Sequence, residues 1–228
     1  MTSYSLPMSI FLLSPLFPRS IFSADPHPGN ILYIAPGSMG RDEMLGLIDY
    51  GQVKTLPDSF RLQLAKSIYL TRAAIEVDPR SFKSTSAKTA KSSVTYDPEV
   101  HARAKASLAK HMTEIGFQSK HMYEDTMYEL CCVYFGRNDE AWLYPRNFVQ
   151  WSDAMQTSDP LGSLAEIEDA VMVVMTGLYL RGLGHALQQP RDLAQAWGPL
   201  AERALKEAGR LDEVQAEVSA WSDKGPVK

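Results

Sequence analysis

Two short stretches decide the fold of this chain of 228 residues. They are Ala24-Asp25-Pro26-His27-Pro28-Gly29-Asn30 and, nineteen residues further on, Asp49-Tyr50-Gly51. The first stretch carries an aspartate with an asparagine five residues on, and the second offers another aspartate. Carboxylate and amide oxygens are the hard ligands that Mg²⁺ prefers, and a positioned aspartate can accept a proton from a hydroxyl group. Each residue alone is equally typical of a turn, but the joint pattern indicates a site.

The sequence between the two stretches predicts a β-hairpin. Residues 30–34 are typical of a short strand, residues 35–43 contain one proline and two glycines, and residues 44–48 predict a second strand. The hairpin ends on Asp49, so we expect Asn30 and Asp49 to lie at neighbouring strand ends. Together with Asp25, these side chains should converge on one cluster of ions.

Beyond the hairpin the pattern predicts roughly six helices. Asp58 is expected to cap the first of them, which carries apolar residues on one face. Asp97-Pro98 opens a helix to about Ile115, and another spans residues 122–135. Residues 163–166 form a capping-box pattern before an apolar helix, and the last helix, at residues 193–204, is expected to break or restart near Gly198-Pro199.

This pattern divides the chain into three segments. Residues 1–20 form an atypical N-terminal segment, residues 21–210 a mainly α domain with a small β-hairpin, and residues 211–228 a polar C-terminal tail. Within the domain, residues 81–93 are rich in Ser, Thr, Lys and Ala and predict a flexible loop.

Composition excludes several classes of protein. The net charge of −4 argues against a nucleic-acid partner, which needs a basic face. The apolar part of residues 1–20 is broken by three prolines, so no transmembrane segment, signal peptide or clear transit peptide is expected. The two cysteines, Cys131 and Cys132, are neighbours and are expected to be buried reduced thiols on a helix.

The two stretches resemble a known family. Asp25 followed by Asn30, then Asp-aromatic-Gly, is the order of the phosphotransfer site in protein-kinase-like folds. The sequences ADPHPGN and LIDYGQ are similar to motifs of the UbiB, or ADCK, family of atypical kinases. The resemblance covers about Phe22 to Leu205.

The resemblance implies the C-lobe of a protein-kinase-like fold lacking the N-lobe, with ATP and Mg²⁺ as cofactors. By this resemblance Asp25 is the catalytic residue, and Asn30 and Asp49 bind the metal and, through it, the nucleotide. His27, Gly29 and Gly51 would shape the loops, with His27 bonding to backbone.

The family also implies an activity and partners. The activity is ATP hydrolysis or phosphotransfer that serves ubiquinone or prenylquinone synthesis. The compartment is the mitochondrion or plastid, and the partners are quinone-biosynthesis proteins or membrane lipid. Only six residues separate Gly51 from Asp58 and no Ala-Pro-Glu follows, which favours a small-molecule substrate over a peptide.

The chain departs from the family pattern at two places. Ser23 replaces the usual histidine before Ala24-Asp25, and only 24 residues precede Asp25, too few for a nucleotide-binding upper lobe. We therefore expect a truncated copy with reduced or no activity alone. The alternative is a non-catalytic helical interaction module derived from such a lobe.

Two further sequence patterns give weaker indications of a functional site. His101, His111 and His121 are spaced by ten residues, a rotation of about 280° on a helix, so they do not share a face as zinc ligands must. Arg181, in a segment that also resembles the family, is as well explained by a structural ion pair as by a functional role.

Overall fold

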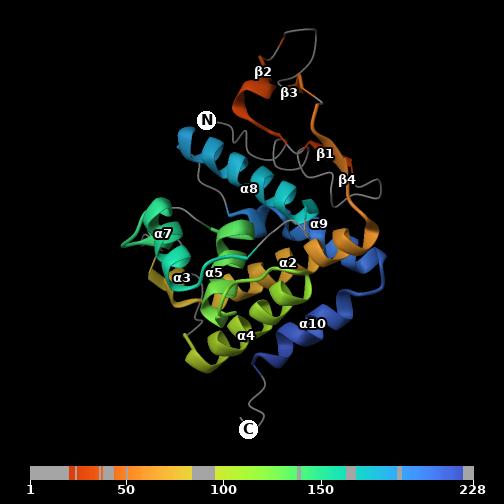
Figure 1. Cartoon of the computed structure of the whole chain (residues 1–228). Coiled ribbons are helices and arrows are strands. Elements are labelled where there is room, and N and C mark those ends of the chain that lie inside the picture. The colour runs from red at the N-terminus through yellow and green to blue at the C-terminus, as the bar shows by residue number, and fades with distance from the viewer. Residues whose placement is uncertain are drawn as a thin grey trace.

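The computed structural model describes residues 21–23, 25–35, 37, 44–49, 51–83, 96–137, 140–162, 168–188 and 192–222. Most of these residues are helical, and two small sheets lie together at one end of the molecule (Figure 1). The expected fold class, mainly α with a small β-hairpin, is confirmed, and it is consistent with the helical lobe of a kinase-like fold. The predicted capping box at residues 163–166 and the part of the predicted loop from residue 84 on lie outside the described residues.

The strands form two antiparallel pairs, one nested inside the other. The predicted hairpin is present: β2 (Ile31–Ile34) pairs with β3 (Met44–Leu47), with Ile31 opposite Leu47. Outside it, β1 (Ile21–Ser23) pairs with β4 (Val53–Thr55), with Ser23 opposite Val53. The outer pair was not predicted from the sequence.

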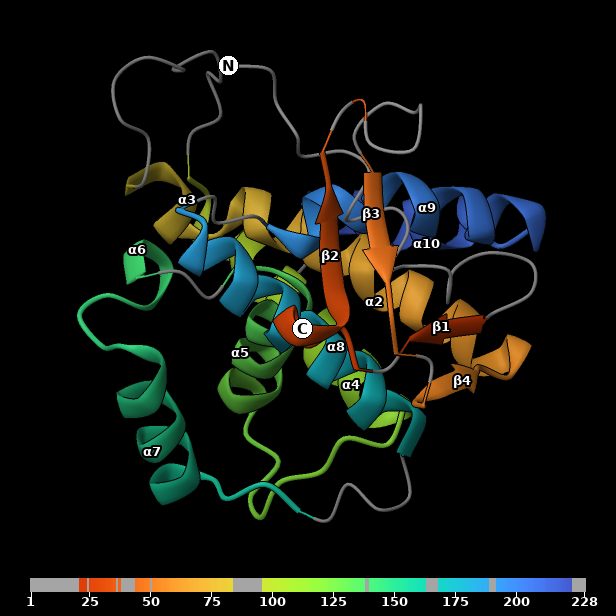
Figure 2. The same ribbon diagram turned by 90° about the horizontal axis from the view of Figure 1, so that it is seen from above.

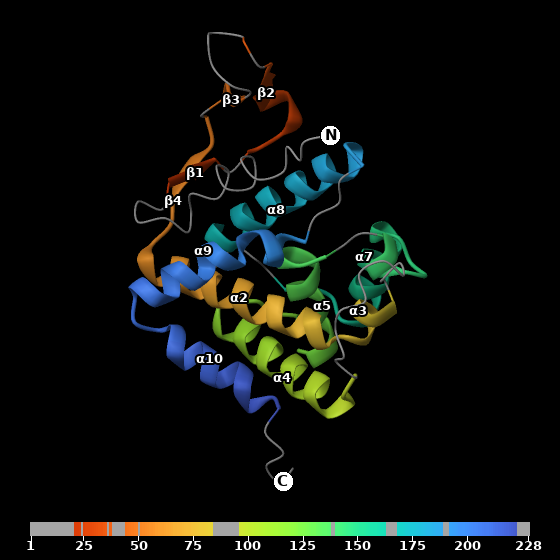
Figure 3. The same cartoon turned by 180° about the vertical axis from the view of Figure 1, so that it is seen from behind.

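Helix α2 (Asp58–Val77) is the centre of the helical part. It packs against α9 (Leu193–Glu207), α4 (Pro98–Glu114), α5 (Glu124–Phe135) and α10 (Leu211–Ala220), as Figures 1 and 3 show. Neighbours on several sides require apolar residues on more than one face, and α2 accordingly buries Leu64, Ile68, Leu70 and Ile75. Burial of this kind supplies most of the stabilisation of a helical domain.

Shorter helices flank this centre. They are α3 (Pro79–Lys83), α6 (Glu140–Leu143) and α7 (Phe148–Ser158). A capping box begins α7: Gln150 N donates to Asn147 Oδ1, and Asn147 N donates to Gln150 Oε1. Among the described residues, no helix is both long and apolar enough to cross a bilayer.

Helix α8 (Glu168–Ala186) lies between the strands and the other helices. Figures 1 and 3 show the two sheets on one side of α8, with α9 and α5 on the other, and Figure 2 shows the hairpin crossing over α8. The helix is therefore placed to connect the sheets to the helical core.

Several predicted helix boundaries hold. Asp97 caps α4 by accepting from Glu99 N and Val100 N, and Pro98 is the first residue of that helix, as predicted. Cys131 and Cys132 are buried free thiols on α5, also as predicted. Burial raises the pKa of Cys131 to about 12, which keeps its thiol protonated.

Other boundaries differ from the prediction. Asp58 is the first residue of α2 rather than its cap, and its carboxylate accepts from Arg61 Nε. Helix α9 continues through Pro199 without a break. Residues 81–83, expected in a loop, end α3, and the expected tail begins with α10, which packs on α2 and α9.

Candidate functional site

The nested strand pairs bring the two motif-bearing segments together. Since Ser23 is opposite Val53 and Ile31 is opposite Leu47, residues 24–30 and 48–52 both run between the same two strand pairs. Ile48 N donates to Asn30 O at 3.1 Å and extends the inner ladder into this region. Asp49, one residue on, is therefore held beside the end of the Asp25–Asn30 loop.

Asn30 is bonded directly to the predicted catalytic residue. Its side-chain Nδ2 donates to Asp25 O at 3.2 Å and to Asp25 Oδ2 at 3.3 Å. Both side chains are only partly buried, so a solvent-borne ligand can reach them. The amide nitrogen is used in this contact, which leaves the amide oxygen of Asn30 as the atom available to a metal ion.

His27 shapes the loop between them. Its Nδ1 accepts from Gly29 N at 3.1 Å, and Asn30 N donates to His27 O at 2.8 Å. These contacts close the single turn of 3₁₀-helix η2 (Pro28–Asn30), which sets the direction of the Asn30 side chain. The expectation that His27 bonds to backbone is confirmed.

Asp49 is exposed and sits in a tight turn. Its Oδ1 accepts from Gly51 N at 2.7 Å. Aspartate side chains commonly accept from the backbone two residues further on, which forms an Asx-turn. A Cβ on Gly51 would lie 3.1 Å from the same oxygen, which explains why glycine suits the position. Tyr50 lies outside the described residues.

The structure thus brings Asp25 and Asn30 into contact and places Asp49 at the adjoining strand end. Within the described part of the chain, no three His, Cys, Asp or Glu side chains gather as a metal site. The predicted metal ligands are Asn30 and Asp49, and asparagine is not among these four residue types. The catalytic and metal-binding roles of these residues stay predictions.

Sequence reasoning missed two supports on α8. The ring of Tyr179 meets the ring of His27 edge to face, with centroids 6.1 Å apart and planes at 86°. At the other end of the helix, Asp169 pairs with Lys54 of β4 at 3.0 Å. No sequence signal marks either contact, because each joins residues more than a hundred positions apart.

Arg181 on the same helix is buried and bonds to backbone. Its Nη1 donates to Gly136 O at 3.2 Å and its Nη2 to Tyr134 O at 3.3 Å, at the C-terminal end of α5. Burial lowers the pKa of this guanidinium to about 9, although Asp192 opposes the shift. These contacts give Arg181 a structural role, with carbonyl oxygens as its partners.

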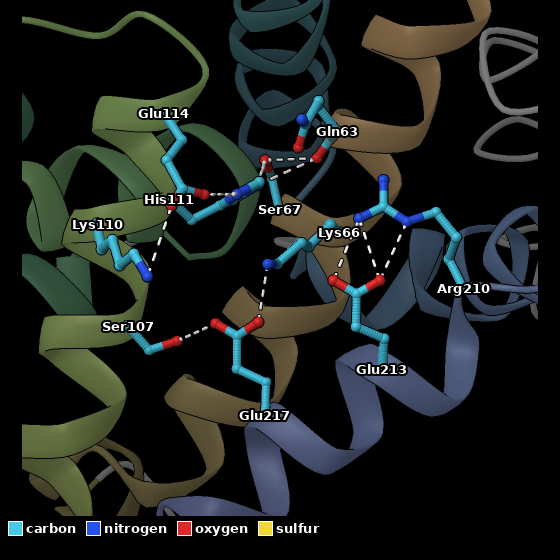
Figure 4. Close-up of polar contacts among 10 residues, drawn as sticks. All are labelled: Gln63, Lys66, Ser67, Ser107, Lys110, His111, Glu114, Arg210, Glu213 and Glu217. Atoms are coloured by element: carbon cyan, nitrogen blue, oxygen red, sulfur yellow. Dashed lines mark hydrogen bonds and ion pairs between the residues drawn. The ribbon is translucent and has the colours of Figure 1, made fainter.

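A second polar cluster joins α2, α4 and α10 (Figure 4). Ser67 and His111 lie 2.9 Å apart between Oγ and Nε2, and Glu114 Oε2 lies 4.0 Å from His111 Nδ1. Glu217 bridges Lys66 and Ser107 nearby. Ser, His and Glu in this order are the residue types of a nucleophilic triad.

The geometry excludes such a role for Ser67. His111 Nε2 also lies 3.2 Å from Gln63 O, a carbonyl that can only accept, so Nε2 carries the proton and cannot serve as the base. Ser67 Oγ itself donates to Gln63 O, and neither Ser67 nor His111 is accessible to a substrate. The cluster holds α2 against α4.

A third cluster closes the C-terminal end of α2. The carboxylate of Asp78 accepts from Arg80 N, Nε and Nη2 and from Tyr128 OH, and His101 Nε2 lies 3.4 Å away. Burial raises the pKa of Asp78, but His101, Arg80 and Tyr128 outweigh it and hold that pKa well below its usual range. The guanidinium of Arg80 stacks on Trp142 at 4.0 Å and also pairs with Glu129.

The three histidines spaced by ten residues have separate surroundings. His101 approaches Asp78, His111 contacts Ser67, and His121 stacks on Tyr123 with centroids 5.1 Å apart.

Comparison with known families gives one match. Residues 7–85 match the family model described as ABC1 atypical kinase-like domain. The comparisons with curated proteins and with solved structures return no match. The matched span contains both sheets and every predicted site residue. The resemblance to an atypical kinase family drawn from the two motifs is thus confirmed, and this part of the chain is similar to the ABC1 atypical kinase-like domain.

Proposed function

We propose that residues 24–52 form the catalytic and metal-binding part of an ATP- and Mg²⁺-dependent atypical kinase or ATPase. The observation that carries the proposal is the pair of hydrogen bonds from Asn30 to Asp25, set beside the strand end that leads to Asp49. The match of residues 7–85 to an atypical kinase-like domain supports the same reading.

Each residue has a role that its contacts support. Asn30 orients the Asp25 carboxylate through its amide nitrogen, so that the carboxylate can accept a proton from an attacking hydroxyl or water. The amide oxygen of Asn30 and the carboxylate of Asp49 would hold Mg²⁺, since they are hard oxygen donors from adjoining segments. When bound, Mg²⁺ neutralises charge on the phosphates. Gly51 N keeps Asp49 oriented.

A titration of the 228-residue chain tests the site. Mn²⁺ with millimolar ATP, followed by water-proton relaxation, measures even weak metal–nucleotide binding. We expect binding by the wild type and a loss of about tenfold or more in Asp49→Asn and Asn30→Ala, because the first removes the negative charge of one ligand and the second removes the other ligand. Asp153→Asn, on the exposed face of α7, is the matched control and should bind like the wild type.

Hydrolysis of ATP separates binding from catalysis. Asp25→Asn should keep the metal–nucleotide complex but lower the rate of phosphate release by about 10²–10⁴-fold, the usual contribution of a positioned base. Equal binding by wild type, Asp49→Asn and Asn30→Ala would reject the site. The chain would then be a non-catalytic helical interaction module.

The pathway is a separate part of the proposal. The wording of the two motifs links the chain to prenylquinone synthesis in mitochondria or plastids, next to quinone-biosynthesis proteins or membrane lipid. Quinone content should fall in cells that lack the chain and should recover with the wild type but not with Asp25→Asn. Unchanged quinone content would remove this assignment and leave the ATP site untouched.

A further inference from the structure

We propose that α8 is the support that positions the catalytic loop, with Tyr179 acting as a positioning residue through His27. This inference rests on the proposed function of residues 24–52. Tyr179 does not touch the predicted reacting groups; it acts on the loop that carries them.

The first step is the contact between the two rings. An edge-to-face pair with centroids 6.1 Å apart is a favoured aromatic geometry, and it fixes the plane of the His27 ring. That plane matters because His27 Nδ1 accepts from Gly29 N. A histidine that turned away would release Gly29 N and open the turn that ends at Asn30.

The second step continues from this turn to the site. Asn30 N donates to His27 O, and the Asn30 side chain donates to Asp25. These contacts follow one another along the same short loop, which links the orientation of the Asp25 carboxylate to the position of Tyr179. A misplacement of about 1 Å in such a group can lower a rate about a hundredfold.

The third step is the anchoring of α8 itself. Arg181 follows Tyr179 by two residues, a rotation of about 200°, so the two side chains leave opposite faces of the helix. Tyr179 faces the loop, whereas Arg181 is buried and donates to Gly136 O and Tyr134 O of the core. The helix is therefore fixed to α5 next to the point at which it supports the loop.

A second link lies about 15 Å away along the helix, since ten residues separate Asp169 from Tyr179. Asp169 pairs with Lys54 of β4, the strand that follows the Asp49 segment. Helix α8 thus contacts both motif-bearing parts of the chain: the Asp25 loop through Tyr179, and the Asp49 segment through β4. Two contacts on one helix therefore link both parts to the same support.

The test compares Tyr179→Leu with Tyr179→Phe, which keeps the ring. We expect Tyr179→Leu to lower kcat for ATP hydrolysis about tenfold with little change in KM, and Tyr179→Phe to retain the wild-type values. Met175→Ala, one turn earlier on α8 and exposed, is the matched control and should also retain them. Equal values of kcat in Tyr179→Leu and the wild type would overturn the proposal.

A second readout needs no activity. The amide resonance of Gly29 in ¹⁵N-labelled protein reports the hydrogen bond to His27, and it should move in Tyr179→Leu but not in Tyr179→Phe or Met175→Ala. If the 228-residue chain shows no hydrolysis, the metal–nucleotide titration still tests the proposed function, and this resonance still decides the positioning role. A Gly29 resonance that stays in place in Tyr179→Leu would reject the role, with urea unfolding used to verify that the variant is folded.

Discussion

His111 is a buried base that remains neutral in the folded protein. Burial and the nearby Lys66 lower its pKa to about 4, although Gln63, Glu114 and Glu217 act in the opposite direction. In the unfolded chain the pKa is about 6.5. The unfolded state therefore binds a proton first as the pH falls, and the free energy of unfolding should decrease between pH 6.5 and pH 4.

The size of this effect follows from the shift. A difference of about 2.5 pKa units corresponds to a loss of about 3 kcal/mol across that interval. Urea unfolding at pH 7 and pH 4.5 should show a larger drop in stability for the wild type than for His111→Gln, which cannot be protonated. Parallel pH dependence in both proteins would show that another group is responsible.

Asp78 is a buried charge with several partners. Asp78→Asn removes the negative charge and replaces one of the two oxygens that accept from Arg80 and Tyr128 with an amide group that only donates, which leaves the guanidinium less well paired. Breaking a buried pair of this kind costs about 3–5 kcal/mol. Thermal unfolding should show the loss, whereas Asp153→Asn, exposed on α7, should change stability by less than about 0.5 kcal/mol.

The side-chain contacts of some residues could be predicted from the sequence, and those of others could not. The contact of His27 with the backbone was predictable because it lies within one turn, whereas the sequence did not predict the hydrogen bonds from Asn30 to Asp25. The contacts of Asp78 and His111 gave no signal, since Tyr128 of α5 reaches Asp78, and Ser67 of α2 reaches His111, only after the helices pack. The contact of Tyr179 with His27 belongs to the same class.

At the level of elements, the junction after α5 depends on a glycine. A Cβ on Gly136 would lie 2.3 Å from Ile75 Cδ1 and 2.7 Å from Cys132 O. Gly136→Ala should therefore destabilise the protein by about 1–3 kcal/mol through overpacking. On α8, a Cβ on Gly182 meets no described atom within 4 Å, so Gly182→Ala should be neutral or stabilising by up to about 1 kcal/mol.

Urea unfolding of the two glycine variants measures the contrast directly. Equal stability of Gly136→Ala and the wild type would mean that α2 and α5 have room to separate at this point. Gly136→Ala also tests the Arg181 contact, because Gly136 O accepts a hydrogen bond from that guanidinium.

Local signals explain which elements could be predicted. Asp97 and Pro98 mark the start of α4 by themselves, and the hairpin is marked by two apolar runs around a Pro- and Gly-containing loop. Helix α10 was missed because it is short and half of its residues are polar, and its place on α2 and α9 is set by packing. The β1–β4 pair was missed because three-residue strands have no periodicity to read.

For the whole molecule, the sheet end exposes apolar side chains. Tyr33 is 61% exposed, Ile48 57%, Leu32 47% and Val53 46%. Large apolar side chains exposed at one end of a molecule favour association. We expect the chain to self-associate at tens of micromolar, and the double variant Leu32→Ser, Tyr33→Ser to do so less, as measured by light scattering.

Val149→Ser is the control for this prediction. Val149 is 64% exposed on α7, away from the sheets, and its replacement should leave association unchanged. A wild-type chain that stays monomeric at these concentrations would contradict the prediction.

The nested strand pairs also dictate an order of folding. Ile21 pairs with Thr55, and bringing these residues together in an open chain means closing a loop of more than thirty residues. Loop-closure entropy grows with the logarithm of loop length, so prior formation of the β2–β3 hairpin shortens the effective loop to the two motif-bearing segments. The outer β1–β4 pair should then form last. Substitutions that weaken β2 or β3 should consequently slow the assembly of the Asp25–Asn30–Asp49 region, even where they touch none of its side chains.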